Sequence, residues 1–192
     1  MTDWDFQEEE DKTTSVFSVE LERDLLDKNI IVIHGELDEK LCNRIAKECL
    51  ILEEKKPKHV KIILNSVGGE VYHALLVYNS IRSLVLSGAK VTIEVRGLAA
   101  SAGAIILQAG SERIAHKWSR FMLHEVGAFE YGKCTELQEQ STEVAKLNEM
   151  VLRILAERTG KKLKTLKKLV RKKDYWMSAE EALKFGLIDK VL

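Results

Sequence analysis

The strongest constraint on the fold is the alternation of short apolar segments with segments of helical spacing. Apolar runs closed by glycine occupy residues 29–35 (NIIVIHG) and 59–69 (HVKIILNSVGG), and a stretch with apolar residues every three or four positions follows each. The apolar runs indicate buried strands, and the 3.6-residue spacing indicates amphipathic helices. Strands separated by helices pair in parallel, because each helix returns the chain to the starting edge of the sheet. The sequence therefore predicts an α/β fold.

The same alternation continues to the C-terminus. The last expected helix begins with a capping box, Ser178 followed by Glu181, and ends at Gly186. Further strands are expected at 90–97, as two short pieces within 111–127, and at the C-terminal end. The remaining helices are expected from Asp38 to before Pro57, at 70–84, within 102–110 up to Gly110, at 134–158 and at 162–173.

Composition excludes several classes of protein. The 192 residues carry 30 basic and 30 acidic side chains, so no net charge draws the chain to nucleic acid or to a membrane surface. No apolar run approaches the roughly 20 residues of a membrane-spanning helix, and the acidic start has the wrong sign for a signal or transit peptide. Three cysteines are too few for a disulfide framework, so Cys42 and Cys49 are expected as buried or half-buried free thiols. We expect a cytoplasmic protein.

The acidic start also suggests the domain organisation. Residues 1–15 contain six acidic residues and one lysine, which indicates a flexible arm that becomes ordered late or only in an assembly. Residues 16–192 are long enough for a single domain with a substantial core. Eight basic residues fall within 161–173, but Leu163, Leu166 and Val170 form an apolar stripe there, so a solvated helix face is favoured over a nucleic-acid site. The spacing of His34, His59, His73 and His116 is not that of metal ligands, so no metal site is expected.

Three features at the ends of expected elements point to chemistry. The pair Gly68–Gly69 ends one strand, where backbone N–H groups lie open to a ligand. Ser101 begins a short buried helix, and His124 ends an apolar strand. A serine, a histidine and free backbone amides supply the nucleophile, the general base and the oxyanion hole of acyl transfer. Each feature also has a structural interpretation, as a helix cap, a strand-end histidine and a turn.

Four motifs extend this pattern into a resemblance to a known family. The segments LNSVGGEV, GLAASAGAIILQAG, FMLHE and MSAEEALKFGLIDKV resemble, in order and approximate spacing, the proteolytic subunit of the Clp protease over residues 29–192. The resemblance implies a crotonase-like α/β fold of repeated strand–strand–helix units with a protruding long helix for ring–ring contact. It implies that Ser101 is the nucleophile and His124 the general base. The N–H groups of Gly69 and Ala102 would form the oxyanion hole, and residues 127–133 would begin the strand and long helix that dock two rings.

The resemblance also implies an activity and partners. The chain would be a serine endopeptidase subunit of a self-compartmentalising protease, a homo-oligomer of two stacked heptameric rings that cleaves unfolded polypeptides through an acyl-enzyme. No cofactor would be needed, since ATP would be used only by a Clp-type unfolding ATPase. Two alternatives stay open: a weakly active or inactive ring subunit, and an acyl-CoA enzyme of the related crotonase type.

The sequence departs from the family pattern at its third catalytic residue. The position of the family's aspartate falls on Leu169 or Val170, neither of which can orient a histidine. Asp174 is the nearest acid and would need a local shift of the chain, while a backbone carbonyl or a water molecule could fix the histidine instead. Val67 replaces the usual proline before the glycine pair. The acidic arm also differs from the family's N-terminal segment, which lines the pore where the unfolding ATPase docks. This difference argues against pairing with such an ATPase.

Overall fold

The computed structural model describes residues 19–128, 131–171 and 173–192, so the expected acidic arm, residues 1–15, lies outside the described residues. A helix at 19–27 precedes the first strand. The strands are β1 (Ile30–Leu37), β2 (His59–Gly69), β3 (Lys90–Ala100), β4 (Glu112–Ala115), β5 (Arg120–Leu123), β6 (Tyr175–Ser178) and β7 (Lys190–Val191). The helices are α2 (Glu39–Lys55), α3 (Val71–Leu86), α4 (Ala102–Leu107), α5 (Cys134–Thr159), α6 (Leu163–Val170) and α7 (Ala179–Phe185).

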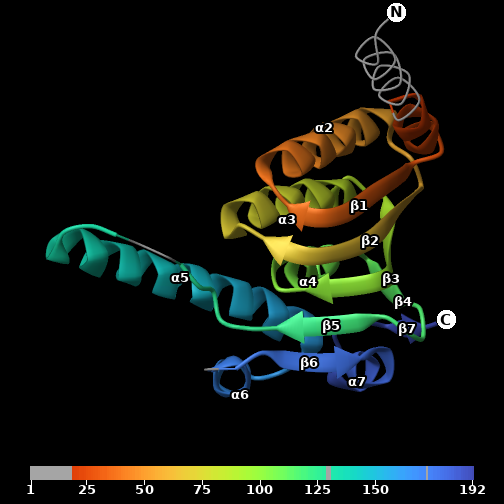
Figure 1. Ribbon diagram of the computed structural model, residues 1–192. Coiled ribbons are helices and arrows are strands. Elements are labelled where there is room, and N and C mark those ends of the chain that lie inside the picture. Colours follow the sequence, from red (N-terminus) through yellow and green to blue (C-terminus); the bar gives the residue numbers. More distant parts are fainter. Residues whose placement is uncertain (1–18, 129–130, 172) are drawn as a thin grey trace, which may run out of the picture.

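The strands form one largely parallel sheet, which confirms the predicted α/β class. The order is β1-β2-β3-β4-β7, and β5 branches from β3 (Figure 1). The first part of β3 pairs with β4, whereas Leu98–Ala100 at its end pairs with β5. The single antiparallel ladder among the described strands joins β5 to β6. The branch matters because β3 ends at Ala100, directly before the serine that the sequence analysis selected.

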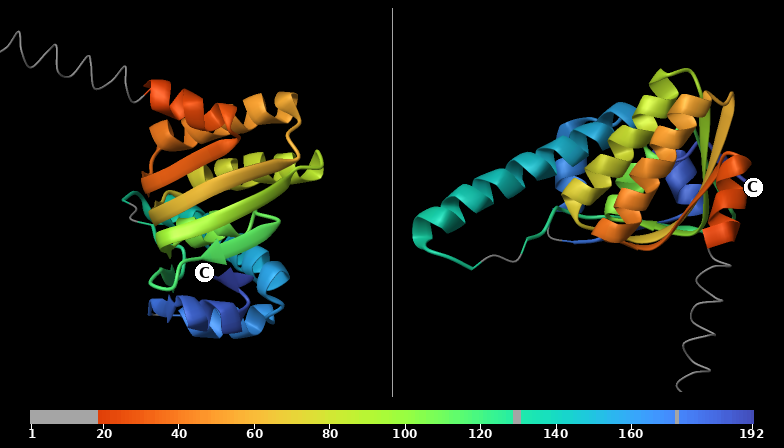
Figure 2. Two further views of the ribbon diagram at one scale, coloured as in Figure 1. Left: turned by 90° about the vertical axis from the view of Figure 1, so that its right-hand side faces the viewer. Right: turned by 90° about the horizontal axis from the view of Figure 1, so that it is seen from above.

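Helices α2, α3 and α4 lie on one face of the sheet (Figure 2). Asp38 caps α2, since its Oδ1 accepts a hydrogen bond of 2.7 Å from the Leu41 N–H. The helix ends at Lys56, which adopts a left-handed conformation before Pro57. Cys42 and Cys49 are buried free thiols in α2, as predicted, and Cys134 is an exposed free thiol.

Helix α5 extends away from the sheet (Figure 1). Its buried residues lie in the C-terminal half: Leu147, Val151, Leu152 and Leu155. Gly160 ends the helix in a left-handed conformation, as expected. The expected strand within 127–133 is absent from the described residues there, 127–128 and 131–133. The preceding strand β5 ends at Leu123, where its ladder with β6 also ends, and its ladder with β3 ends at Met122.

The C-terminal part contains one element that the sequence analysis missed, strand β6. Its neighbour α6 has the expected stripe, with Leu166 and Val170 buried and Leu163 partly buried. The capping box of α7 is confirmed, because Ser178 and Glu181 each accept a hydrogen bond from the other's backbone N–H.

An ion pair ties the C-terminus to the sheet. The Arg113 guanidinium in β4 contacts Asp189 at 2.5 Å, and the Arg113 side chain is almost completely buried. It also donates to the Gln108 side chain at 2.7 Å and to the Gly186 carbonyl at 3.0 Å. A single side chain therefore connects β4, the end of α4 and the turn after α7.

Candidate active site

Ser101 lies in the sharp turn between β3 and α4. Its backbone has a φ of 53°, in the left-handed region that serine rarely adopts. The Ser101 N–H donates to the Met122 carbonyl at 2.9 Å, which fixes the turn against β5. Although Ser101 occupies the N-cap position of α4, its side chain makes no capping hydrogen bond. The hydroxyl is therefore available for another contact.

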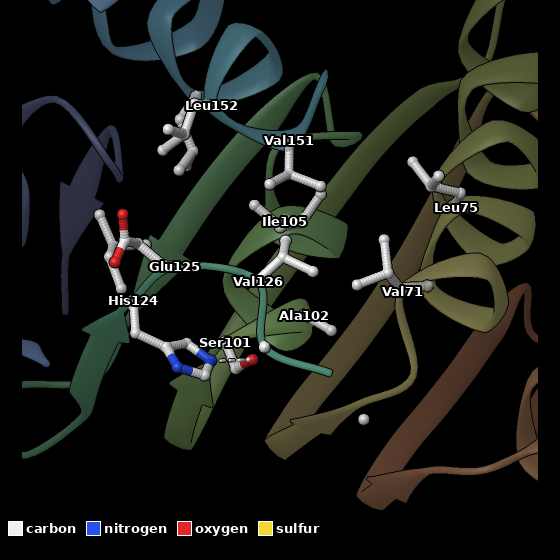
Figure 3. A pocket seen from close by; sticks show the side chains of 15 residues that line it. Val71, Leu75, Ser101, Ala102, Ile105, His124, Glu125, Val126, Val151 and Leu152 are labelled. Atoms are coloured by element: carbon white, nitrogen blue, oxygen red, sulfur yellow. Dashed lines mark hydrogen bonds between the residues drawn. The ribbon is translucent and has the colours of Figure 1, made fainter. Parts of the chain in front are cut away.

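That contact is to His124, as Figure 3 shows. The Ser101 Oγ lies 2.6 Å from His124 Nε2. The parallel ladder between β3 and β5 explains why they meet: Ala100 pairs with Met122, so the residues just beyond the two strand ends are neighbours. With the imidazole protonated on Nδ1, Nε2 can accept the hydroxyl proton, as a general base must.

The glycine pair lies against the same turn. A Cβ on Gly68 would lie 2.7 Å from Ser101 Cβ and 3.1 Å from the Ala102 nitrogen, so a side chain there would collide with the serine turn. Ala102 is the first residue of α4, and its N–H has no partner within the helix. Gly69, Ser101 and Ala102 line one cavity. The structure thus brings together the two residues expected to supply oxyanion donors.

Ser66 holds the glycine turn in place, a role that the sequence analysis missed. Its side chain is buried, donates to the Gly35 carbonyl at 2.7 Å and accepts from the Gly68 N–H at 3.1 Å. The Gly68 N–H is therefore already engaged, which favours Gly69 as the donor beside Ala102. A signal was present, because Ser66 occupies an inward position in the alternation of β2 that is otherwise apolar.

An apolar cavity of about 160 Å³ adjoins Ser101 and His124 (Figure 3). Its wall combines side chains from three helices with the segment that follows His124. The apolar residues labelled in the figure are Val71, Leu75, Ala102, Ile105, Val126, Val151 and Leu152. Such a cavity suits an apolar group held next to the reacting atom. This wall could not be identified from the sequence, because helical spacing shows that a residue is buried but does not show which residues it faces.

Asp174 comes near the histidine without bonding to it. Its Oδ1 lies 4.0 Å from His124 Nδ1, beyond hydrogen-bond distance, and the Asp174 side chain is 54% exposed. The antiparallel ladder between β5 and β6 causes this approach, since Leu123 pairs with Tyr175 and the preceding Asp174 lies beside His124. Val170 is buried in the core and Leu169 packs against it, so the position of the family's aspartate is apolar here.

The buried cysteines are unsuited to nucleophilic chemistry. Burial raises the pKa of Cys42 to about 11 and that of Cys49 to about 12. Both thiols therefore stay protonated near neutral pH and are poor nucleophiles. Within residues 19–128, 131–171 and 173–192, no three His, Cys, Asp or Glu side chains lie close enough to hold a metal ion. No helix in this part of the chain has the length and apolar character needed to cross a membrane.

Comparison with known proteins assigns the family. The sequence profile of the Clp protease family matches residues 12–192. The ATP-dependent Clp protease proteolytic subunit 2 of Chlamydia trachomatis serovar D is 36% identical over 173 residues, which cover 88% of this chain and 82% of that protein. The protein of the same name from Chlamydia muridarum is 36% identical, and proteolytic subunit 1 of Chlamydia felis is 35% identical, with the same coverage. The chain therefore belongs to the Clp protease proteolytic subunit family, a family of serine peptidases.

Proposed function

We propose that Ser101 and His124 are the catalytic pair with which this chain cleaves polypeptides. The observation that carries the proposal is the 2.6 Å contact between Ser101 Oγ and His124 Nε2 at the mouth of an apolar cavity. The Ser101 backbone, with a positive φ, keeps the hydroxyl off the helix terminus and directs it to the imidazole. A structural cap would instead bond the backbone of its own helix.

The geometry supports a sequence of acyl transfer. His124 Nε2 takes the hydroxyl proton while Ser101 Oγ attacks the scissile carbonyl. The N–H groups of Gly69 and Ala102 stabilise the oxyanion that forms. The imidazolium then protonates the leaving amine, which leaves an acyl-enzyme on Ser101. A water molecule, deprotonated by His124, attacks this ester; the imidazolium then returns the proton to Ser101 Oγ as the acyl–Oγ bond breaks and the second product leaves. No cofactor takes part, as in the Clp protease family generally.

Asp174 completes the proposed triad as the residue that orients His124. Its carboxylate lies 4.0 Å from Nδ1, and an adjustment of about 1 Å at the start of β6 would bring it into hydrogen-bond range. Catalytic hydrogen bonds often tighten only when substrate binds. The distance of 4.0 Å between Asp174 and His124 also supports a second candidate function, that of a weakly active ring subunit. The kinetics of an Asp174 variant distinguish an active peptidase from such a subunit.

The partners are inferred from the relatives and from the surface. The relatives are named subunits of ATP-dependent Clp proteases, so we propose a Clp-type unfolding ATPase as the partner that uses ATP. We also propose a homo-oligomer of two stacked heptameric rings built from a single peptidase domain, residues 16–192, in the cytoplasm. Helix α5 supports the assembly, since Leu137 and Met150 on it are exposed apolar residues. A stable monomer in sedimentation at micromolar concentration would contradict it.

Peptide hydrolysis tests the proposed activity. Wild-type protein should release a fluorophore from a short peptide with an apolar residue before the scissile bond, and Ser101→Ala should abolish the release. Ser80→Ala is the control, because Ser80 is a half-buried serine of α3 whose hydroxyl bonds the Leu76 carbonyl of its own helix. Equal hydrolysis by the wild type and by Ser101→Ala would show that another residue is the nucleophile.

A further inference from the structure

The segment immediately after His124 forms a wall of the cavity without regular secondary structure. Residues 124–127 all line the cavity, yet β5 ends at Leu123 and residues 124–128 belong to no helix or strand. Glu125, Gly127 and Ala128 are exposed to solvent, whereas Val126 is partly buried, so an acceptor from the protein matters for the Val126 N–H. Its position shapes the space next to Ser101, since all four residues line the cavity.

Such an acceptor comes from helix α5. The Val126 N–H donates to the Asn148 Oδ1 at 3.1 Å. Val126 is partly buried against the core, so water does not readily replace this acceptor. The bond links two parts of the chain that are 22 residues apart and that both line the same cavity.

Asn148 is an unexpected residue at its position in α5. It lies next to the buried Leu147 and one turn before Val151 and Leu152, two cavity residues. Asparagine is a poor helix former because its side chain competes for backbone hydrogen bonds, and leucine would pack better on this face. Neither helix formation nor apolar packing explains the asparagine, whereas the bond to Val126 does.

We propose that Asn148 is a positioning residue that holds the 124–127 wall in the conformation that binds the peptide. The proposal rests on the proposed active site of Ser101 and His124. The Asn148 side chain acts as an acceptor, and its amide nitrogen is not needed for this contact. The contact between Ser101 and His124 is fixed separately, by the ladder between β3 and β5. Loss of the Asn148 acceptor should therefore weaken peptide binding more than it slows attack by Ser101.

Two substitutions of Asn148 separate the effect of its hydrogen-bond acceptor from the effect of its packing. Asn148→Asp keeps an oxygen acceptor at the same place, whereas Asn148→Leu keeps the volume and removes it. Asn148→Leu should raise the KM for the fluorogenic peptide about tenfold, with kcat and the rate of fluorophosphonate labelling within about threefold of the wild type. Asn148→Asp should restore KM to within about threefold. Asn43→Leu, at an exposed position of α2, is the matched control and should change neither quantity.

Amide hydrogen exchange measured by mass spectrometry decides the proposal independently of activity. Exchange in residues 124–128 should quicken by about tenfold or more in Asn148→Leu and stay near the wild-type rate in Asn148→Asp. Unchanged exchange in Asn148→Leu, or equal effects of Leu and Asp, would overturn the proposal. So would peptide hydrolysis and labelling that fall in proportion in Asn148→Leu. If the proposed active site is itself wrong, the fluorophosphonate will not label Ser101 in the wild-type protein, and this result is distinct from those that test Asn148.

Discussion

Ser101 combines two local properties that rarely occur together in a serine. Its backbone has a positive φ, and its hydroxyl contacts a histidine instead of capping the helix that it precedes. Small neighbours make this possible, because Ala100, Ala102 and Gly103 leave the turn room to approach Gly68 and Ser66. The sequence placed Ser101 and His124 at element ends, but the sign of φ could not be predicted, since it depends on how β3 meets β5.

The first prediction concerns the glycine beside this turn. Gly68→Ala would force a methyl group to 2.7 Å from Ser101 Cβ and 3.1 Å from the Ala102 nitrogen. We expect peptide hydrolysis to fall at least about a hundredfold, because the oxyanion donors and the nucleophile are both displaced. Gly88→Ala is the control. Gly88 has a φ of 102°, close to that of Gly68, so alanine strains the backbone equally at both positions, but a methyl group on residue 88 meets no neighbouring atom. Equal activity in the two variants would contradict this account.

The second prediction concerns the third catalytic residue. Asp174→Asn should keep the fold and lower kcat by about a hundredfold or more, because an amide no longer stabilises the imidazolium or the correct tautomer. The exposed neighbour variant Glu180→Gln should leave kcat unchanged. If kcat of Asp174→Asn falls less than about tenfold, a backbone carbonyl or a water molecule orients His124 and Asp174 is not catalytic.

At the scale of elements, sequence patterns predicted most helices and strands because each is set by local signals. The capping residues Asp38 and Ser178 and the stop at Gly160 mark helix ends, and all three act there. Strand β6 was missed because it is only four residues long and is defined by its pairing with β5. The sequence indicated Asp174 as the nearest acid, but its distance from His124 could not be predicted, since it follows from that ladder and not from the family's spacing.

The third prediction concerns the Arg113 connection between elements. Arg113→Ala leaves the buried Gln108 side-chain oxygen and the Gly186 carbonyl without their donor, while Asp189, whose side chain is 40% exposed, can be hydrated, so unfolding free energy should fall by about 2–3 kcal/mol. Arg153→Ala is the control, because its ion pair with Glu149 on α5 is exposed and should contribute less than about 1 kcal/mol. Denaturant titration measures both. Similar losses in the two variants would show that Arg113 does not connect the C-terminus to the sheet.

At the scale of the whole molecule, one sheet face carries helices α2, α3 and α4, while charged side chains gather on the other. Glu94 on that face contacts Lys61 at 2.6 Å, Arg96 at 2.6 Å and His116 at 2.8 Å. Parallel sheets are usually covered on both faces, and here Glu94 is only 5% exposed, so its charged partners cover it. Such a surface was not predictable from the net charge of zero, which says nothing about where the charges lie.

The fourth prediction concerns acid stability. Burial acts to raise the pKa of Glu94, but hydrogen bonds from Lys61, His116 and Arg96 outweigh it and lower the pKa from 4.5 to about 2. As the pH falls, the Glu94 carboxylate of the unfolded chain is protonated before that of the folded chain. The stabilisation that the ionised Glu94 contributes to the fold is therefore complete above about pH 4.5 and is lost as the pH falls towards 2. Glu94→Gln should flatten the fall of unfolding free energy between these pH values, whereas the exposed control Glu54→Gln should not. An unchanged slope in Glu94→Gln would contradict this assignment.

The central claim is that Ser101 is a nucleophile activated by His124, and covalent labelling tests it most directly. Wild-type protein treated with a fluorophosphonate should carry one adduct per chain, located on Ser101 by peptide mass spectrometry, because only an activated serine reacts readily with this reagent. Ser101→Ala and His124→Ala should each abolish the adduct, while Ser80→Ala should retain it. An adduct on a different serine, or full labelling of His124→Ala, would contradict the account.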